Sequence, residues 1–367
     1  MKKKLVMLIM AVMVAGISAG CGASAGDAAE AVSDASEAAE DVAEAASETK
    51  EDLSEAAEDV QEAVEEVQEE VSEEIAETPE ADEEDEENYE TGDASKDDPR
   101  NQDDIGEKEI LVVSFGTSYN DSRRLTIGAI EQALADAYPD WAVRRAFTSQ
   151  IIIDHVKKRD NVTIDNVAEA LERAEANGVK QLVVQPTHLM DGFEYNDLME
   201  ELAQYADAFD SITVGDPLLT TDDDFDKVAE AVHDATSSYD DGKTAIVFMG
   251  HGTEADSNEI YAKMQTIFDD KGYENYYIGT VEATPTVDDV IKAIDGKGYE
   301  RVILRPLMVV AGDHANNDMA GDENDSWKSL FEKAGYETVP VLEGLGQLED
   351  VQQIYAAHTS KAIESIK

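Results

Sequence analysis

The sequence predicts an α/β protein with two similar halves, each built on a parallel sheet, after a long acidic segment. From Glu109 on, short apolar runs typical of buried strands alternate with helical stretches. Several phrases of the first half also return in the second half, in the same order. Strands separated by helices of this length form parallel sheets covered on both faces. The chain of 367 residues has room for two such units and an N-terminal extension.

Residues 1–21 have the pattern of a lipoprotein-type signal peptide. A positive "MKKK" precedes an apolar run, and the small residues "SAG" precede Cys21. The run is shorter than the ~20 residues that a membrane-spanning helix needs. "SAGC" resembles the lipobox of bacterial lipoproteins, although Ser18 stands where Leu is usual. We expect Cys21 to be lipidated and the protein to be extracytoplasmic, lipid-anchored to the cell membrane; a plain secretory signal is the alternative.

Residues 22–108 have the composition of an acidic stalk and linker. "SEAAEDVAEA" at 36–45 returns as "SEAAEDVQEA" at 54–63, an offset that corresponds to about five helical turns. Little apolar surface among so many Glu predicts a solvated, partly helical stalk, followed from Pro79 by a disordered linker. Such a segment would hold the folded part away from the membrane.

The charge balance limits the partners. The chain has 84 acidic and 28 basic residues, a net charge of -56. This excess argues against nucleic acid as a partner and is compatible with divalent cations. Cys21 is the single cysteine, so no disulfide forms within the chain.

The two expected halves are residues 109–240 and 241–367. In the first half the pattern predicts strands at 109–115, 141–147 and 179–186. It predicts helices at 123–138, 151–159 and 167–178. In the second half it predicts strands at 243–249, 276–282 and 300–310. It predicts helices at 258–272 and 287–298. Ligands in such folds bind beyond the C-terminal ends of the strands.

A long phrase at 183–197, "VVQPTHLMDGFEYND", corresponds to "LRPLMVVAGDHANND" at 304–318. Both have Pro and Gly six residues apart, with a titratable residue two positions after the Gly. The comparison sets Glu194 against His314, in segments read as loops that follow apolar strands.

Two shorter phrases correspond in the same order. "SFGTS" and "GHGTE" set Phe115 against His251, and "RAFTS" and "TVEAT" set Phe147 against Glu282. Each short string is weak evidence of a repeat when taken alone. It is stronger evidence here because the strings occur in the same order in both halves.

The comparison predicts a chemical asymmetry between the halves. His251, Glu282 and His314 would form one wall of a cleft, and two imidazoles with a carboxylate suit an open site for a divalent first-row metal. Phe115 and Phe147 would form an aromatic wall suited to a flat apolar ligand. Taken singly, each His could instead be a hydrogen-bonded loop residue, and Glu282 a surface carboxylate.

The other histidines need separate interpretations. His188 lies near Glu194 in the sequence, and it is either part of the site or structural. His155, His233 and His358 lie in helical stretches, where a structural role is expected.

At these residues the sequence resembles the anaerobic sirohydrochlorin cobaltochelatases, a family of class II tetrapyrrole chelatases. The resemblance runs from about Ile110 nearly to the C-terminus, and its most specific string is "RPLMVVAGDHANNDMAGDENDSWK". It implies two similar α/β halves with the active site between them. It also implies that His251 is a metal ligand and proton acceptor, and that Glu282 and His314 are metal ligands.

The resemblance implies an enzyme that inserts a divalent metal into sirohydrochlorin or a related tetrapyrrole, as in anaerobic cobalamin biosynthesis. Co²⁺ is the expected metal, with Fe²⁺ or Ni²⁺ as alternatives, and no organic cofactor is required. Glu194, facing the metal ligands, is expected to be catalytic as the second proton acceptor or to orient the substrate. Phe115, Phe147 and His188 are expected to contact the substrate.

Five arginines near strand ends are candidates for binding the substrate's carboxylates: Arg123, Arg124, Arg144, Arg145 and Arg305. The alternative function is a lipid-anchored carrier of haem, a corrinoid or a metal, without turnover. The sequence leaves open whether the protein forms a homo-oligomer.

Overall fold

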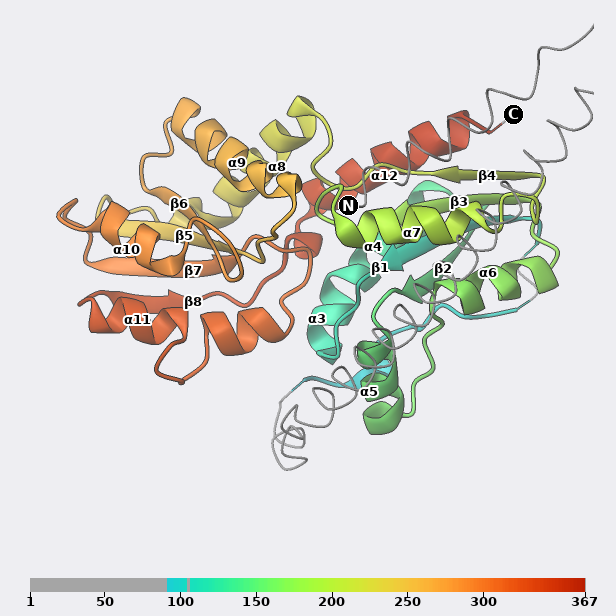
Figure 1. The fold of residues 1–367 in the computed structure, drawn as a ribbon, viewed down its shortest axis with the longest axis horizontal. Coiled ribbons are helices and arrows are strands. Elements are labelled where there is room, and N and C mark those ends of the chain that lie inside the picture. Colours follow the sequence, from blue (N-terminus) through green and yellow to red (C-terminus); the bar gives the residue numbers. More distant parts are fainter. Residues whose placement is uncertain (1–90, 104–105, 367) are drawn as a thin grey trace, which may run out of the picture. The chain divides into compact units, whose positions relative to one another are not determined.

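Two four-stranded sheets form the frame of the described part of the chain, residues 91–103 and 106–366, in the computed structural model (Figure 1). The strand order is β2-β1-β3-β4 in the first sheet and β6-β5-β7-β8 in the second. All strand pairs are parallel. The prediction of two similar parallel-sheet α/β halves is therefore confirmed.

The predicted signal peptide, Cys21 and most of the predicted stalk lie outside the described residues. Within the part that is described, no helix combines the length and the apolar character needed to cross a bilayer.

The elements of the first half follow in the order β1 (Lys108–Ser114), α3 (Asn120–Leu125), α4 (Ile127–Ala137), β2 (Ala142–Phe147), α5 (Gln150–Asp160), α6 (Val167–Ala176), β3 (Gln181–Pro186), α7 (Phe193–Ala203), β4 (Ser211–Val214) and α8 (Asp222–Thr236). Those of the second half are β5 (Thr244–Gly250), α9 (Glu259–Asp270), β6 (Tyr276–Thr280), α10 (Val287–Ile294), β7 (Arg301–Pro306), the π-helical turn η4 (Ala315–Met319), α11 (Trp327–Lys333), β8 (Glu337–Pro340) and α12 (Glu349–Glu364).

The central strands are apolar on both faces because helices cover each sheet on both sides. On β1, Ile110 and Val112 belong to one core cluster, while Leu111 and Val113 belong to another. The alternation has the two-residue period of a strand. Helix α6 ends where the sequence predicts, since Gly178 takes a φ of +76°, which glycine adopts without strain.

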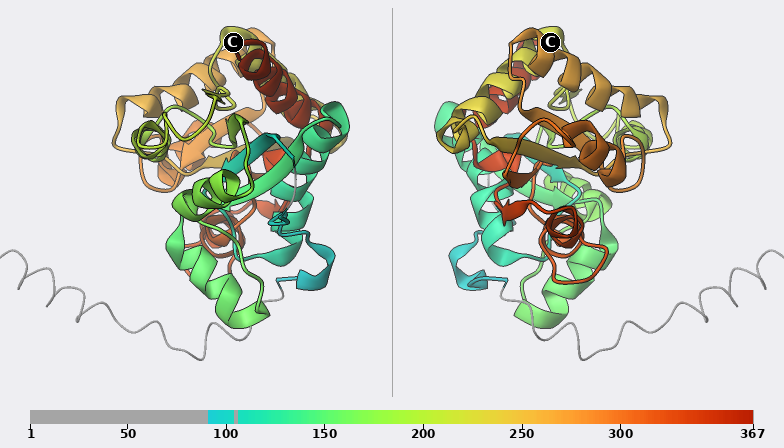
Figure 2. Two further views of the ribbon diagram at one scale, coloured as in Figure 1. Left: turned by 90° about the vertical axis from the view of Figure 1, so that its right-hand side faces the viewer. Right: turned by 90° about the vertical axis from the view of Figure 1, so that its left-hand side faces the viewer.

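The last helix of each half lies against the other half. Helix α12 packs on α4, β3 and β4 of the first half, and Figures 1 and 2 show it beside α4. The Tyr355 hydroxyl of α12 donates a hydrogen bond of 2.8 Å to the Thr187 carbonyl. Helix α8 of the first half packs on α9 of the second half. Its Thr236 Oγ1 lies 2.7 Å from Tyr276 Oη on β6. This exchange ties the two sheets together, and the boundary at residue 240 stays a prediction.

Apolar residues of both halves belong to one core cluster, which includes Val112 of β1 and Phe248 of β5. Burial of this shared apolar surface stabilises the pairing of the halves. The C-terminal ends of both sheets therefore keep a fixed relation to each other.

Residues 91–103 are folded onto the first half, which differs from the prediction of a disordered linker reaching residue 108. The Asp97 carboxylate accepts hydrogen bonds of 2.7 Å from Arg123 Nε and from Arg145 Nη1. Burial alone would raise the pKa of Asp97, but the hydrogen bonds from both guanidinium groups lower it. Glu131 accepts two further hydrogen bonds from Arg145. Two buried guanidinium groups require such partners, because an unpaired buried charge is strongly destabilising.

Candidate metal centre

His251, Glu282 and His314 come together at the C-terminal edge of the second sheet. One ligand-forming atom from each lies within 4.8 Å of the others. His251 directly follows β5, Glu282 follows β6 by two residues, and His314 precedes η4 after β7. Because β5 lies between β6 and β7, the ends of three neighbouring strands bring these side chains to one place. Two imidazoles and a carboxylate are suitable ligands for a divalent first-row cation.

Two glycines shape the turn that carries His251. Gly252 has a φ of +90°, and a Cβ there would lie 2.8 Å from the Ala283 nitrogen. A Cβ on Gly250 would collide with the Tyr261 ring. Each glycine therefore allows an approach of neighbouring atoms that any other residue would prevent.

Backbone hydrogen bonds tie this turn to the next strand end. The His251 carbonyl accepts from the Glu282 nitrogen at 2.8 Å and from the Val281 nitrogen at 3.1 Å. The relative position of the two ligands is thus set by the main chain, and it does not depend on side-chain packing alone.

The Nδ1 atoms of both histidines have hydrogen-bond acceptors. His251 Nδ1 lies 2.9 Å from the Gly252 carbonyl oxygen, and His314 Nδ1 lies 2.6 Å from Asp318 Oδ2. Because a carbonyl and a carboxylate only accept, these contacts favour the tautomer with the proton on Nδ1, which leaves Nε2 of each ring for a cation. The two rings are nearly perpendicular, with centroids 4.7 Å apart.

Asp318 is a neighbour of the metal centre that the sequence did not predict. The segment after β7 was predicted to be a loop, but it forms a helical turn that continues into η4. That turn places Asp318, four residues after His314, against its imidazole. The spacing of four residues between His314 and Asp318 could have predicted this contact, but only if the segment is taken to be helical.

Glu194 also lies in a helix and not in the predicted loop, since it belongs to the first turn of α7. Partial burial raises the pKa of its carboxyl, and the nearby His251 opposes that shift. Glu194 is therefore close enough to the metal centre to interact with it electrostatically.

His188 lies beside Glu194 and is not a member of the metal cluster. Neither of its ring nitrogens has a hydrogen-bond partner among the described residues, and burial lowers its pKa to about 4. Its Nε2 lies 3.9 Å from Glu194 Oε2. A neutral imidazole and a carboxylate thus face each other across a short gap.

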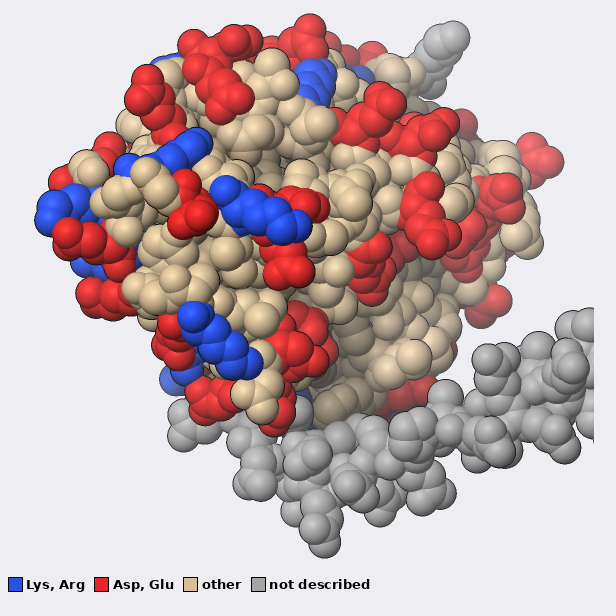
Figure 3. All heavy atoms as spheres, turned by 60° about the vertical axis from the view of Figure 1, so that its left-hand side comes forward, with Lys and Arg blue, Asp and Glu red and all other residues tan. Residues whose placement is uncertain are grey.

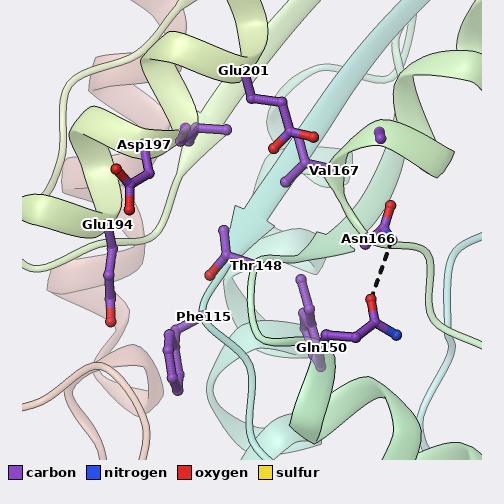
Figure 4. A pocket seen from close by; sticks show the side chains of 11 residues that line it. Phe115, Thr148, Gln150, Asn166, Val167, Glu194, Asp197 and Glu201 are labelled. Atoms are coloured by element: carbon purple, nitrogen blue, oxygen red, sulfur yellow. Dashed lines mark hydrogen bonds between the residues drawn. The ribbon is translucent and has the colours of Figure 1, made fainter. Parts of the chain in front are cut away.

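The two predicted aromatic residues differ in their surroundings. Phe115, after β1, is 46 % exposed, whereas Phe147, at the end of β2, is fully buried. Both line a cavity of about 350 Å³ in the first half, shown in Figure 4. The lining residues are Phe115, Phe147, Thr148, Gln150, Asn166, Val167, Ala168, Glu194, Asp197, Leu198 and Glu201.

Most of the predicted arginine contacts to substrate are not supported. Arg123 and Arg145 are buried and paired with Asp97, and Arg144 and Arg305 are also buried. Arg124, whose side chain is 34 % exposed, is the accessible member of the five. The expected position near strand ends is wrong for Arg123 and Arg124, which lie in α3, and the sequence could not show which of the five side chains face inward.

The paired sheets have a fold found in sirohydrochlorin chelatases. The solved structure of SirB from Bacillus subtilis with Fe³⁺ is similar, with a TM-score of 0.51 at 13% identity over 70% of this chain and 96% of that chain. The sirohydrochlorin chelatase SirB from Bacillus subtilis subspecies spizizenii in complex with cobalt has a TM-score of 0.50 at 14% identity, over 71% and 96% of the chains. At these identities the likeness concerns the fold.

Closer similarity comes from sequence. The family model for cobalt chelatase (CbiK) matches residues 108–364. A sirohydrochlorin cobaltochelatase from Salmonella typhimurium is 37% identical over 70% of this chain and 96% of its own length. The sirohydrochlorin cobaltochelatase CbiKC from Nitratidesulfovibrio vulgaris is 31% identical over 71% of this chain and 92% of its length. The chain belongs to the cobalt chelatase (CbiK) family, as the resemblance predicted.

The hydrogen bond from His314 to Asp318 predicts a measurable effect on metal affinity. Asp318→Ala removes the acceptor that orients the imidazole, and we expect Co²⁺ to bind about 10 to 100 times more weakly. Titration of the protein with Co²⁺ measures this. Asp313→Ala, which removes an exposed carboxylate next to His314, is the matched control; equal losses in both variants would contradict the orienting role.

Proposed function

We propose that this protein inserts Co²⁺ into sirohydrochlorin or a related tetrapyrrole, as in anaerobic cobalamin biosynthesis. The observation that carries the proposal is the convergence of His251, Glu282 and His314 in a chain that matches the cobalt chelatase family over residues 108–364. Both curated relatives reported above are named sirohydrochlorin cobaltochelatases. Fe²⁺ and Ni²⁺ remain alternatives as the metal.

Metal insertion exchanges one divalent cation for two pyrrole N–H protons. In the proposed reaction His251, Glu282 and His314 hold the cation first, the two histidines through Nε2. Imidazole and carboxylate bind such ions less tightly than thiolate binds soft metals. The ion can therefore leave these ligands for the macrocycle. When it passes to the macrocycle, the Nε2 of His251 becomes free and accepts one of the two protons.

Glu194 is the proposed acceptor of the second proton. Its carboxylate belongs to the first half, while the cation is held by the second, so a macrocycle between them would meet a base on the opposite side. Partial burial raises the pKa of Glu194, which makes this carboxyl a stronger base than an exposed one. The proton balance then closes, with one proton on His251 and one on Glu194.

The acidic surface of the described part supports a cationic substrate. Acidic side chains are spread over the face in Figure 3, with fewer basic side chains among them. Such a surface attracts divalent cations. A tetrapyrrole with several carboxylates must approach by a less acidic route, and Arg124 is the candidate cation for its carboxylates.

The carrier alternative would use the same three ligands without turnover, and it is not favoured because the family and both curated relatives are chelatases.

The full chain mixed with sirohydrochlorin and Co²⁺ is expected to form the cobalt complex catalytically, and absorbance measures its formation. His251→Ala should abolish turnover, and Glu194→Gln should lower kcat about 100-fold. His155→Ala, on α5, should have no effect.

The pH dependence tests the role of Glu194 in the same assay. A proton acceptor must be ionised, so kcat of the wild-type protein should fall as the pH drops through the raised pKa of Glu194. This fall in kcat at low pH should be absent in Glu194→Gln. Stoichiometric binding of the tetrapyrrole without turnover would contradict the enzyme and support the carrier.

We also propose, from the sequence, that Cys21 is lipidated and that the acidic segment holds the enzyme outside the membrane. In cell fractions the wild-type protein should sediment with membranes, whereas Cys21→Ser should be soluble because the lipid acceptor is gone. Equal distribution of both forms would contradict the anchor.

A further inference from the structure

Residues 91–103 supply a buried carboxylate to the first half. Asp97 lies in this segment, outside residues 108–364, which the family model matches. Its side chain is 3% exposed, and it accepts hydrogen bonds from the guanidinium groups of Arg123 and Arg145, which are themselves fully buried. The segment thus contributes to the interior of the first half although it precedes the family match.

The guanidinium group of Arg123 holds the loop that follows β1. Its Nη1 donates to the Thr117 carbonyl at 3.1 Å, while its Nε donates to Asp97. Thr117 stands two residues after Phe115, in the loop that brings the Phe115 ring to the cavity of about 350 Å³ (Figure 4). The position of Phe115 therefore depends on where Arg123 is held.

The guanidinium group of Arg145 lies against the second aromatic residue of that cavity. Asp97 accepts from both Nη1 and Nη2 of Arg145, at 2.7 and 3.1 Å. The guanidinium carbon lies 5.8 Å from the centre of the Phe147 ring, within the range of a cation–π contact. Gly116, next to Phe115, packs on the same ring, since a Cβ there would lie 2.5 Å from Phe147 Cδ2. One carboxylate thus binds both of the cations that support the aromatic side of the cavity.

Further hydrogen bonds fix the segment at the start of α3. The Thr91 carbonyl accepts from the Asp121 nitrogen at 2.7 Å, and Asn120 Nδ2 donates to Thr91 Oγ1 at 3.2 Å. Asn120 Oδ1 in turn accepts from Arg123 Nη2. Thr91 therefore supports the same guanidinium group as Asp97, by a separate route.

We propose that Asp97 is a positioning residue for the tetrapyrrole substrate. Through the guanidinium group of Arg123 it fixes the loop of Phe115, and through that of Arg145 it supports the Phe147 ring. The inference rests on the proposed function, because it concerns how the substrate of that reaction is bound. A flat macrocycle gains most from aromatic side chains that are already in place, since little side-chain freedom is then lost on binding.

Binding of metal-free sirohydrochlorin to the full chain, followed by absorbance, tests the inference. Asp97→Asn replaces the charged acceptor by an amide, and the Kd for sirohydrochlorin should rise about tenfold. The affinity for Co²⁺ should stay unchanged, because the three metal ligands belong to the second half. Asp98→Asn, which removes an exposed carboxylate whose hydrogen bonds stay within residues 98–102, is the matched control. An unchanged Kd for sirohydrochlorin in Asp97→Asn would overturn the inference.

A milder variant applies if Asp97→Asn does not fold. Thr91→Val keeps the shape of the side chain but removes the hydroxyl that accepts from Asn120, and it should raise the Kd for sirohydrochlorin about threefold. Thr91→Ser keeps the hydroxyl and should bind sirohydrochlorin as the wild-type protein does. Equal Kd values for Thr91→Val and Thr91→Ser would overturn the inference.

A double-variant comparison distinguishes positioning from a general loss of stability. Phe115→Ala removes the ring that Asp97 is proposed to hold, so Asp97→Asn should weaken sirohydrochlorin binding much less in the Phe115→Ala protein than in the wild-type protein. Equal losses in the two proteins would overturn the inference. If the proposed function were wrong instead, the wild-type protein would bind sirohydrochlorin without inserting Co²⁺, and the same comparison of Kd values would still decide the role of Asp97.

Discussion

The order of three parallel strands is the constraint on which the site depends. Because β5 lies between β6 and β7, the residues that follow these strands emerge side by side at one edge. Hydrogen bonds from the main-chain nitrogens of residues 281 and 282 to the His251 carbonyl then fix two of the three ligands relative to each other. The third, His314, is held by the turn after β7 and by Asp318. A cation site of this kind needs little reorganisation when the ion arrives, because its ligands are already in place.

The repeated fold gives the two halves different tasks. Both sheets have the same strand order, yet the second carries imidazoles where the first carries Phe115 and Glu194. In the proposed reaction the second half holds the metal, and the first offers an apolar side chain and a base. Helices α8 and α12, exchanged between the halves, together with the shared core keep these two surfaces opposed. The asymmetry lies in a few strand-end residues, and the frame that positions them is common to both halves.

The sequence predicted those features that depend on local pattern. Strands such as β1 and β5 have apolar central residues, and the comparison of strand ends predicted the three residues that the structure brings together. Edge strands β4 and β8, with four residues each, are too short and too exposed to show a clear period. Their existence follows from pairing with a neighbour, which a single sequence does not display.

Features that depend on distant partners could not be predicted. Asp97 stands in an acidic run that resembles a linker, and its role appears only when Arg123 and Arg145 are buried beside it. The same burial removes both arginines from the substrate contacts expected of them. Asp318 and Glu194 were misplaced because polar helical turns after strands have no apolar period to reveal them.

The proposed function depends on one divalent cation being held by two imidazoles and one carboxylate from the second half. X-ray absorption spectroscopy of the protein with one equivalent of Co²⁺ tests it most directly, because imidazole ligands give characteristic outer-shell scattering. We expect scattering from two imidazoles, reduced to one in His314→Ala. A spectrum with oxygen ligands alone, or one that His314→Ala leaves unchanged, would contradict it.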